Sequence, residues 1–350
     1  MDKRQLLKSK LNAMLMDGQI CAKWQDRKGI NAVQLRNYLG LTPKAYRKLL
    51  VGLTNVVESK MCAKEWDSIN FEQVPSVASS RYQKAFGRNA PSAYTSYIEA
   101  VQKGEKTIHA GAVFPYDIVR SVRHGDASAS DEQWKALPDF VPENANVLPL
   151  VDVSGSMQTP VSGSIQAIDV AISLGIYLAQ RQKGAFKDLW CTFSQTPKLE
   201  KLKGDTLSQV ISNMEQADWG MNTNLEAAFT EILRVATKYK VPQEEMPKTL
   251  IVFSDMQFDS ATRTGYSSKK VTAQDSVRQQ YEAAGYNVPS VIYWNLNGQT
   301  GNVPVTYNEE GTALVSGFST SLLKTILSAE KMTPESIMLD AVMQDKYAVI

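Results

Sequence analysis

Apolar and polar residues follow two different periods along the second half of the chain. Short apolar runs rich in β-branched residues, which are typical of buried strands, occur at residues 147–153, 189–193, 250–253, 291–294 and 312–316. Between these runs, apolar residues recur at the three- and four-residue spacing of amphipathic helices, at residues 207–215, 225–238 and 271–284. Such alternation of strands and helices predicts an α/β fold built on a doubly wound, mostly parallel sheet.

The first half of the chain lacks regular strand alternation and is predicted to be mostly helical. Helical spacing occurs at residues 6–16, 32–39, 43–60, 76–88 and 92–103, and Gly or Pro residues bound these segments. The polar stretch at 124–132 is the best candidate for a linker. We therefore expect a helical region at 1–140, an α/β domain at 145–330 and a C-terminal helix at 331–350.

The most informative chemistry lies where the predicted strand at 147–153 ends. Asp152, Ser154 and Ser156 alternate along an extended turn, so their oxygens can converge on one point. Oxygen ligands suit Mg²⁺, Mn²⁺ or Ca²⁺ rather than zinc. A lone Asp-x-Ser-x-Ser is most often a solvated turn or a helix cap. Here, however, a polar loop at 219–224 and a second strand ending in Asp255 stand at the ends of later α/β elements, and the combination favours a metal site.

This pattern of Asp-x-Ser-x-Ser, a later Thr and a later Asp resembles the metal-ion-dependent adhesion site (MIDAS) of the von Willebrand factor A (vWA) domain, whose fold is Rossmann-like. The resemblance implies a ligand set of two acids and three hydroxyls, namely Asp152, Asp255, Ser154, Ser156 and Thr223. It also implies a protein partner that offers an exposed Asp or Glu to the ion, most simply Mg²⁺. One departure is Asn222, which precedes Thr223 where the family more often has Gly and which could compete as a ligand.

Other segments resemble the uncharacterised DUF2828 family, over nearly the whole chain. They lie at residues 46–50, 61–66, 74–78, 82–86 and 311–318. That family joins a helical segment to an A-type domain, and its layout is similar to that of the TROVE-module RNA-binding proteins of the Ro type. The resemblance therefore implies RNA as an alternative ligand, in a Ro-like ribonucleoprotein.

The charge is unevenly spread, although the net charge is only +2. Residues 1–145 hold 21 Lys and Arg against 15 Asp and Glu, whereas the remainder holds 17 against 21. Arg81, Lys84 and Arg88 recur at helical spacing near Phe86 and Tyr94, a mixture that can bind phosphates and stack bases. These three are the candidate nucleic-acid contacts. The alternative, favoured by base rates, is a solvated basic face on a helix with an aromatic core face.

Catalysis finds little support in the sequence. The chain has only two His, His109 and His124, both upstream of the predicted metal domain, and neither a Gly-x-Ser-x-Gly nor a phosphate-loop motif occurs. We expect a non-enzymatic, metal-dependent binding protein, and a metal-dependent hydrolase is the third alternative. No apolar stretch approaches the roughly 20 residues that span a bilayer, so we expect a cytoplasmic protein without membrane contact. Self-assembly stays open, because apolar helix faces pack within or between subunits alike.

Overall fold

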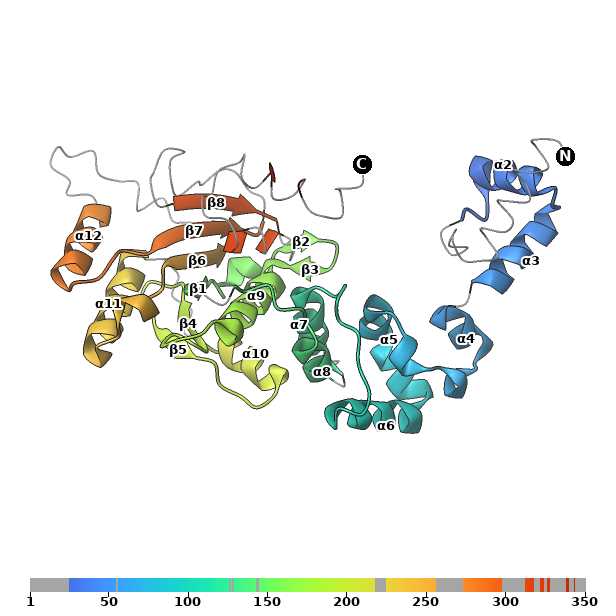
Figure 1. Ribbon diagram of the computed structural model, residues 1–350, viewed down its shortest axis with the longest axis horizontal. Helices are drawn as coiled ribbons and strands as arrows, with labels where there is room; N and C mark the ends of the chain where they lie inside the picture. Colours follow the sequence, from blue (N-terminus) through green and yellow to red (C-terminus); the bar gives the residue numbers. More distant parts are fainter. Residues whose placement is uncertain are drawn as a thin grey trace. The chain divides into compact units, whose positions relative to one another are not determined.

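The structure is a computed structural model that describes residues 25–54, 56–125, 127, 129–142, 145–217, 225–255, 273–297, 312–317, 322–323, 326–327, 338–339 and 343. The chain divides into two compact units. The helical unit comprises Met1–Val74 and Ala85–Tyr97, and the sheet unit comprises Pro75–Lys84 and Ile98–Ile350. Figure 1 draws the elements of both, coloured along the sequence.

The helical unit is built from short helices, as the sequence predicts. They are α2 (Gly29–Leu39), α3 (Pro43–Leu53) and α4 (Val57–Ala63), two 3-10 turns η2 (Trp66–Ser68) and η3 (Phe71–Gln73), and parts of α5 (Ser76–Asn89) and α6 (Pro91–Gln102). The predicted single helix at 43–60 is wrong, because α3 ends at Leu53. Thr54 leaves helical geometry there and its hydroxyl donates to the carbonyl oxygen of Leu50 at 2.5 Å.

Aromatic side chains form the core of the later part of this unit. Phe71 packs against Phe86, Tyr94 and Tyr97 with ring centroids 5.2 to 5.6 Å apart. Phe86 and Tyr94 are buried, so these two rings stabilise the fold and do not present a face on which bases could stack. The core interpretation of the aromatics therefore holds at both positions.

A six-stranded sheet forms the centre of the sheet unit, in the order β5-β4-β1-β6-β7-β8. All neighbours are parallel except the edge strand β5, which is antiparallel to β4. The strands are β1 (Val147–Val151), β4 (Leu189–Thr192), β5 (Leu199–Lys201), β6 (Thr249–Ser254), β7 (Ser290–Asn295) and β8 (Thr312–Ser316), and a separate hairpin joins β2 (Pro160–Ser162) to β3 (Ile165–Gln166). This arrangement confirms the predicted vWA-like and Rossmann-like α/β fold.

Helices cover both faces of the sheet (Figure 1). Along β1, Val147 and Val151 face one core and Leu148 and Leu150 face the other, because successive strand residues point to opposite sides. The first core includes residues of α7 (Pro115–Arg123), α8 (Ser130–Lys135), α9 (Ala167–Arg181) and α10 (Leu207–Glu215). The second includes residues of α11 (Leu225–Tyr239) and α12 (Ala273–Ala283). Short 3-10 turns η4 (Gly155–Gln158) and η5 (Gln243–Glu245) complete the described elements.

Helix α9 approaches β1 unusually closely. A Cβ added to Gly175 would lie 2.6 Å from Cγ2 of Val151, so only glycine fits at this point of the helix. The approach brings the middle of α9 against the strand that carries Asp152 at its end. Among the described residues, no helix is both long enough and apolar enough to span a bilayer.

Candidate functional site

Two of the predicted ligands lie at the carboxyl ends of neighbouring parallel strands. Asp152 follows β1 and Asp255 follows β6, and the register pairs Val151 with Phe253. The backbone N–H of Asp152 donates to the carbonyl oxygen of Phe253 at 3.0 Å, which continues the ladder to the last residue. Because both strands run the same way, their terminal acids meet at one edge of the sheet, where α/β folds bind ligands.

The carboxylate of Asp152 is buried and held at both oxygens. Oδ1 accepts from the backbone N–H of Ser154 at 2.9 Å, and Oδ2 accepts from the hydroxyl of Ser254 at 2.8 Å. Burial raises the pKa of Asp152 above its ordinary value and the charge of Asp255 adds to this, whereas the hydrogen bonds from Ser154 and Ser254 counteract it. The charged carboxylate is therefore under-stabilised in the protein alone, and a nearby cation would correct this.

The two predicted hydroxyls also come together. Oγ of Ser154 and Oγ of Ser156 lie 3.0 Å apart, and both side chains are half-buried. The turn η4 holds them, because the N–H of Met157 donates to the carbonyl oxygen of Ser154 and the N–H of Thr159 to that of Ser156. Asp152, Ser154 and Ser156 thus present oxygens on one side of a single tight turn.

We call this group the carboxyl edge: Asp152, Ser154, Ser156, Ser254 and Asp255. Its donor set is oxygen only and fits Mg²⁺, Mn²⁺ or Ca²⁺. No cluster of three or more His, Cys, Asp and Glu side chains occurs in the described part of the chain, so any ion here would depend on hydroxyls as well as acids. Thr223 and the competing Asn222 lie outside the described residues.

The structure adds one residue that the sequence did not single out. Ser254 is the last residue of β6, is buried, and fixes Oδ2 of Asp152 from the neighbouring strand. A polar residue that ends an otherwise apolar strand, directly before the predicted ligand Asp255, was the available signal. Sequence reasoning cannot show that its partner is an acid 102 residues earlier in the chain.

The candidate nucleic-acid contacts are divided by the structure. Arg81 and Lys84 are exposed on α5 and line a cavity of about 400 Å³. We call this cavity the basic pocket; its polar wall includes Arg81, Lys84, Asp117, Arg120, His124 and Ser164. Arg88 is exposed as well, but it belongs to the helical unit and is not among the residues that line the pocket.

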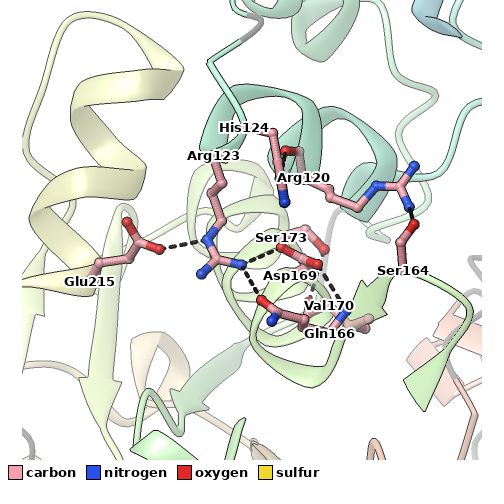
Figure 2. A network of polar contacts seen from close by, with 9 residues as sticks. All are labelled: Arg120, Arg123, His124, Ser164, Gln166, Asp169, Val170, Ser173 and Glu215. Carbon is pink, nitrogen blue, oxygen red and sulfur yellow. Dashed lines mark hydrogen bonds and ion pairs between the residues drawn. The ribbon is translucent and has the colours of Figure 1, made fainter. Parts of the chain in front are cut away.

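Beside the basic pocket, Arg123 anchors α7 to the rest of the sheet unit, as Figure 2 shows. Its guanidinium is hydrogen-bonded and ion-paired with Asp169 of α9, whose side chain is fully buried, and its Nε lies 2.6 Å from Oε1 of Glu215 on α10. It also donates to the side-chain oxygen of Gln166 at 3.3 Å. Asp169 further caps α9 by accepting from the N–H of Gln166 at 2.9 Å. We call these four residues the Arg123 network.

Two family models match the chain and together cover nearly all of it. One, described as "Domain of unknown function (DUF7788)", matches residues 146–348. The other, described as "Domain of unknown function (DUF2828)", matches residues 1–147. The predicted likeness to DUF2828 is therefore confirmed for the first half of the chain, but it does not extend to nearly the whole chain.

The chain is also similar to a viral protein and to a solved structure. "Uncharacterized protein L728" of Acanthamoeba polyphaga mimivirus is 32% identical over 354 residues, which cover 91% of this chain. The match spans only 59% of that relative's own length. The crystal structure of the Deinococcus radiodurans RO (RSR) protein is 13% identical with a TM-score of 0.40, over 91% of this chain and 72% of that one. A likeness this weak carries no inference about function.

Proposed function

The chain belongs to the DUF7788 family, and on this premise we propose that its sheet unit is a non-enzymatic binding domain that engages a partner through a divalent cation at the carboxyl edge. One observation carries the proposal. Asp152 is buried, oriented at both oxygens, and set beside the charge of Asp255 and the hydroxyls of Ser154 and Ser156. Two neighbouring buried acids are unfavourable unless a cation neutralises their charge, and this supports a cation site.

The residues of the carboxyl edge would contribute to ion binding in two ways. Ser254 and the backbone of Ser154 orient the carboxylate of Asp152, while the hydroxyls of Ser154 and Ser156 offer neutral oxygens. A bound Mg²⁺, or Mn²⁺ or Ca²⁺ in its place, would supply positive charge for a partner's carboxylate. Because hydroxyl ligands add no negative charge, they leave that attraction largely intact. We therefore propose a protein partner with an exposed Asp or Glu.

Alternatives from other functional classes stay predictions. A metal-dependent hydrolase would need a base to activate water, and both His residues of the chain precede β1. RNA binding by the basic residues Arg81, Lys84 and Arg88 would show as retention that weakens steeply with salt. The cytoplasmic location is likewise a prediction from sequence alone.

Calorimetry with Mg²⁺ and Mn²⁺ on the full chain tests the metal site. We expect Asp152→Asn to weaken binding at least tenfold, because the substitution removes a charged ligand and keeps the shape of the side chain. Asp205→Asn is the matched control, since Asp205 is exposed and lies before α10, away from the carboxyl edge. Ser154→Ala and Ser156→Ala are expected to weaken binding less, since each removes one neutral donor.

Equal metal affinity in wild type and Asp152→Asn would overturn the assignment. The partner is tested separately, by capture from a native extract in Mg²⁺ and again after chelation. We expect chelation and Asp152→Asn to release the same protein. Capture that persists under both conditions would mean that another surface binds the partner, and turnover of a phosphoester that depends on added metal would favour the hydrolase.

A further inference from the structure

The basic pocket is assembled from three segments that are distant in sequence. Arg81 and Lys84 come from α5, Arg120 and His124 from α7 and the residue that ends it, and Ser164 from the turn between β2 and β3. All of them belong to the sheet unit. Cationic and hydroxyl groups therefore converge on one cavity from three directions, which is how proteins surround an anion.

The cations in this pocket are not neutralised by acids. Within the described part of the chain, Arg81, Lys84 and Arg120 form no ion pair with a carboxylate. Asp117 is the one acid among the residues that line the pocket. Arg120 and Arg81 attract its carboxylate electrostatically, but neither forms an ion pair with it. The lining therefore keeps a positive excess.

The groups that face the pocket are held by neutral partners. Nη1 of Arg120 donates to the hydroxyl of Ser164 at 2.6 Å (Figure 2), and Nζ of Lys84 donates to the carbonyl oxygen of His124 at 3.1 Å. Nδ1 of His124 lies 2.8 Å from the carbonyl oxygen of Arg120. The contacts of Arg120 and Lys84 orient these cations without cancelling their charges, and guanidinium and ammonium groups have further N–H donors to offer.

Arg120 and Arg123 make the contrast clear within a single helix. Arg123 has two carboxylate partners, Asp169 and Glu215, and serves the packing of α7. Arg120, one turn earlier, has a hydroxyl as its partner and lines a cavity. Because the Arg123 network holds α7 against α9 and α10, Arg120 is presented from a fixed helix. Such preorganisation lowers the entropic cost of binding a ligand.

We propose that the basic pocket binds the phosphate group of a small phosphorylated molecule. Arg81, Lys84 and Arg120 contact the phosphate oxygens, and Ser164 supplies a hydroxyl. The volume of about 400 Å³ lies at the small end of ligand sites and suits one phosphomonoester of sugar size. The site shares no residue with the carboxyl edge and does not depend on a bound metal.

Calorimetry on metal-free full chain at low salt tests this, with ribose 5-phosphate as the probe and ribose as the matched ligand without phosphate. We expect binding of ribose 5-phosphate and of inorganic phosphate, and none of ribose. A short oligo-uridine with hydroxyl ends forms the third arm. If the oligo-uridine binds through Arg81 and Arg120 while neither small phosphate binds, the small-molecule proposal is wrong and the pocket reads an RNA backbone instead.

Variants assign the binding to the pocket. Arg120→Gln and Arg81→Gln are each expected to weaken ribose 5-phosphate at least tenfold, as removal of a charge-assisted hydrogen bond does. Asp117→Asn is expected to tighten it roughly fivefold, because it removes a repelling charge from the wall. Arg278→Gln, an exposed charge removal on α12, is the control and leaves the affinity unchanged.

Unchanged affinity in both Arg81→Gln and Arg120→Gln would overturn the proposal, and so would an absence of phosphate binding at millimolar concentration. Arg81 is exposed on α5, so its variant remains informative if Arg120→Gln perturbs folding. Asp152→Asn separates the two sites, because it is expected to keep full phosphate affinity. Loss of metal binding alone therefore leaves this proposal standing, and loss of phosphate binding alone leaves the metal site standing.

Discussion

The carboxyl edge and the basic pocket lie in the same unit but are built in opposite ways. In the carboxyl edge the acids are buried, and Asp152 accepts hydrogen bonds from its own turn and from the neighbouring strand. In the basic pocket the cations Arg81 and Lys84 are exposed and Arg120 is half-buried, and Arg120 and Lys84 are hydrogen-bonded to neutral groups from distant segments. The geometry of the buried site thus comes from the sheet itself, whereas the site nearer the surface needs a separate anchor. The Arg123 network is that anchor.

The largest expected effect comes from removing the anchor. Arg123→Met leaves the fully buried carboxylate of Asp169 without its ion pair, which should reduce the free energy of unfolding by about 3 kcal/mol or more. Urea unfolding measures this loss. Adding Asp169→Asn to the variant should recover part of it, because the unpaired buried charge is then gone.

The same variant, Arg123→Met, should affect ligand binding at the basic pocket but not at the carboxyl edge. Phosphate affinity should fall in Arg123→Met, because α7 no longer holds Arg120 in place, whereas the Mg²⁺ affinity of the folded protein should be kept. Calorimetry of both ligands on one preparation makes the comparison. Equal losses of both affinities in protein that is still folded would show that the two regions are one coupled site, and the contrast between them would be lost.

A smaller effect is expected where α9 approaches β1. Gly175→Ala inserts a methyl group 2.6 Å from Cγ2 of Val151, which is fully buried in the first core of the sheet unit. Overpacking of this kind reduces the free energy of unfolding by roughly 1 to 3 kcal/mol. Since Asp152 directly follows Val151, the strain should weaken metal binding more than phosphate binding. This is the opposite of the effect expected from Arg123→Met.

A double-mutant cycle checks that explanation. In a Val151→Ala background the clash is absent, so the added cost of Gly175→Ala measured by urea unfolding should shrink markedly. An unchanged cost in that background would show that the close approach of α9 to β1 is not what the substitution disturbs.

The smallest expected effect concerns pH. The pKa of Asp152 is raised in the folded protein by burial and by Asp255, so this group destabilises the metal-free fold once the pH exceeds the ordinary carboxyl value of 3.8. Its contribution is most favourable below that value and falls as the pH rises, until the folded carboxyl is also ionised. Asp152→Asn should therefore gain stability relative to wild type, and the gain should be larger at neutral pH than at pH ~4.

Unfolding midpoints of the two proteins across this pH range, measured after chelation, test the sign. Asp117 in the basic pocket also has a pKa raised by burial, countered by Arg120 and Arg81. Asp117→Asn serves as the matched comparison for a carboxyl that faces cations. A wild-type protein that gains stability over Asp152→Asn as the pH rises would contradict the assigned burial cost.

Much of the fold can be predicted from the sequence, because the local pattern of apolar residues agrees with the burial in the structure. The helices at 207–215 and 225–238 and the strand at 312–316 lie within one residue of α10, α11 and β8. Edge strand β5 was not predicted. With only three residues, half-buried or exposed, it carries too short a pattern to be distinguished from a loop. Its pairing with β4 supplies the order that its own sequence does not.

The polar stretch at 124–132 shows where composition misleads. It was predicted as a linker, but α8 begins at Ser130 and packs Trp134 into the first core of the sheet unit. Within the stretch itself, Ser130 and Glu132 are buried, and the backbone N–H of Ala129 donates to Oε1 of Gln83 at 3.3 Å. A polar group can be buried when a partner from elsewhere in the chain satisfies it, and only the tertiary structure supplies that partner.

Local sequence specifies the parallel strands β1, β4, β6, β7 and β8, the helices between them and the turn that carries Asp152, Ser154 and Ser156, because each depends on neighbours within a few residues. The parallel register then brings Asp255 to the same edge. Only the folded chain brings the hydroxyl of Ser254 to Asp152 and gives Arg123 its acid partners. Folding also places Arg120 and Lys84 in the wall of one cavity. The physical reason is that the strength of a charge or a hydroxyl depends on burial and on partners that fold in from far along the chain.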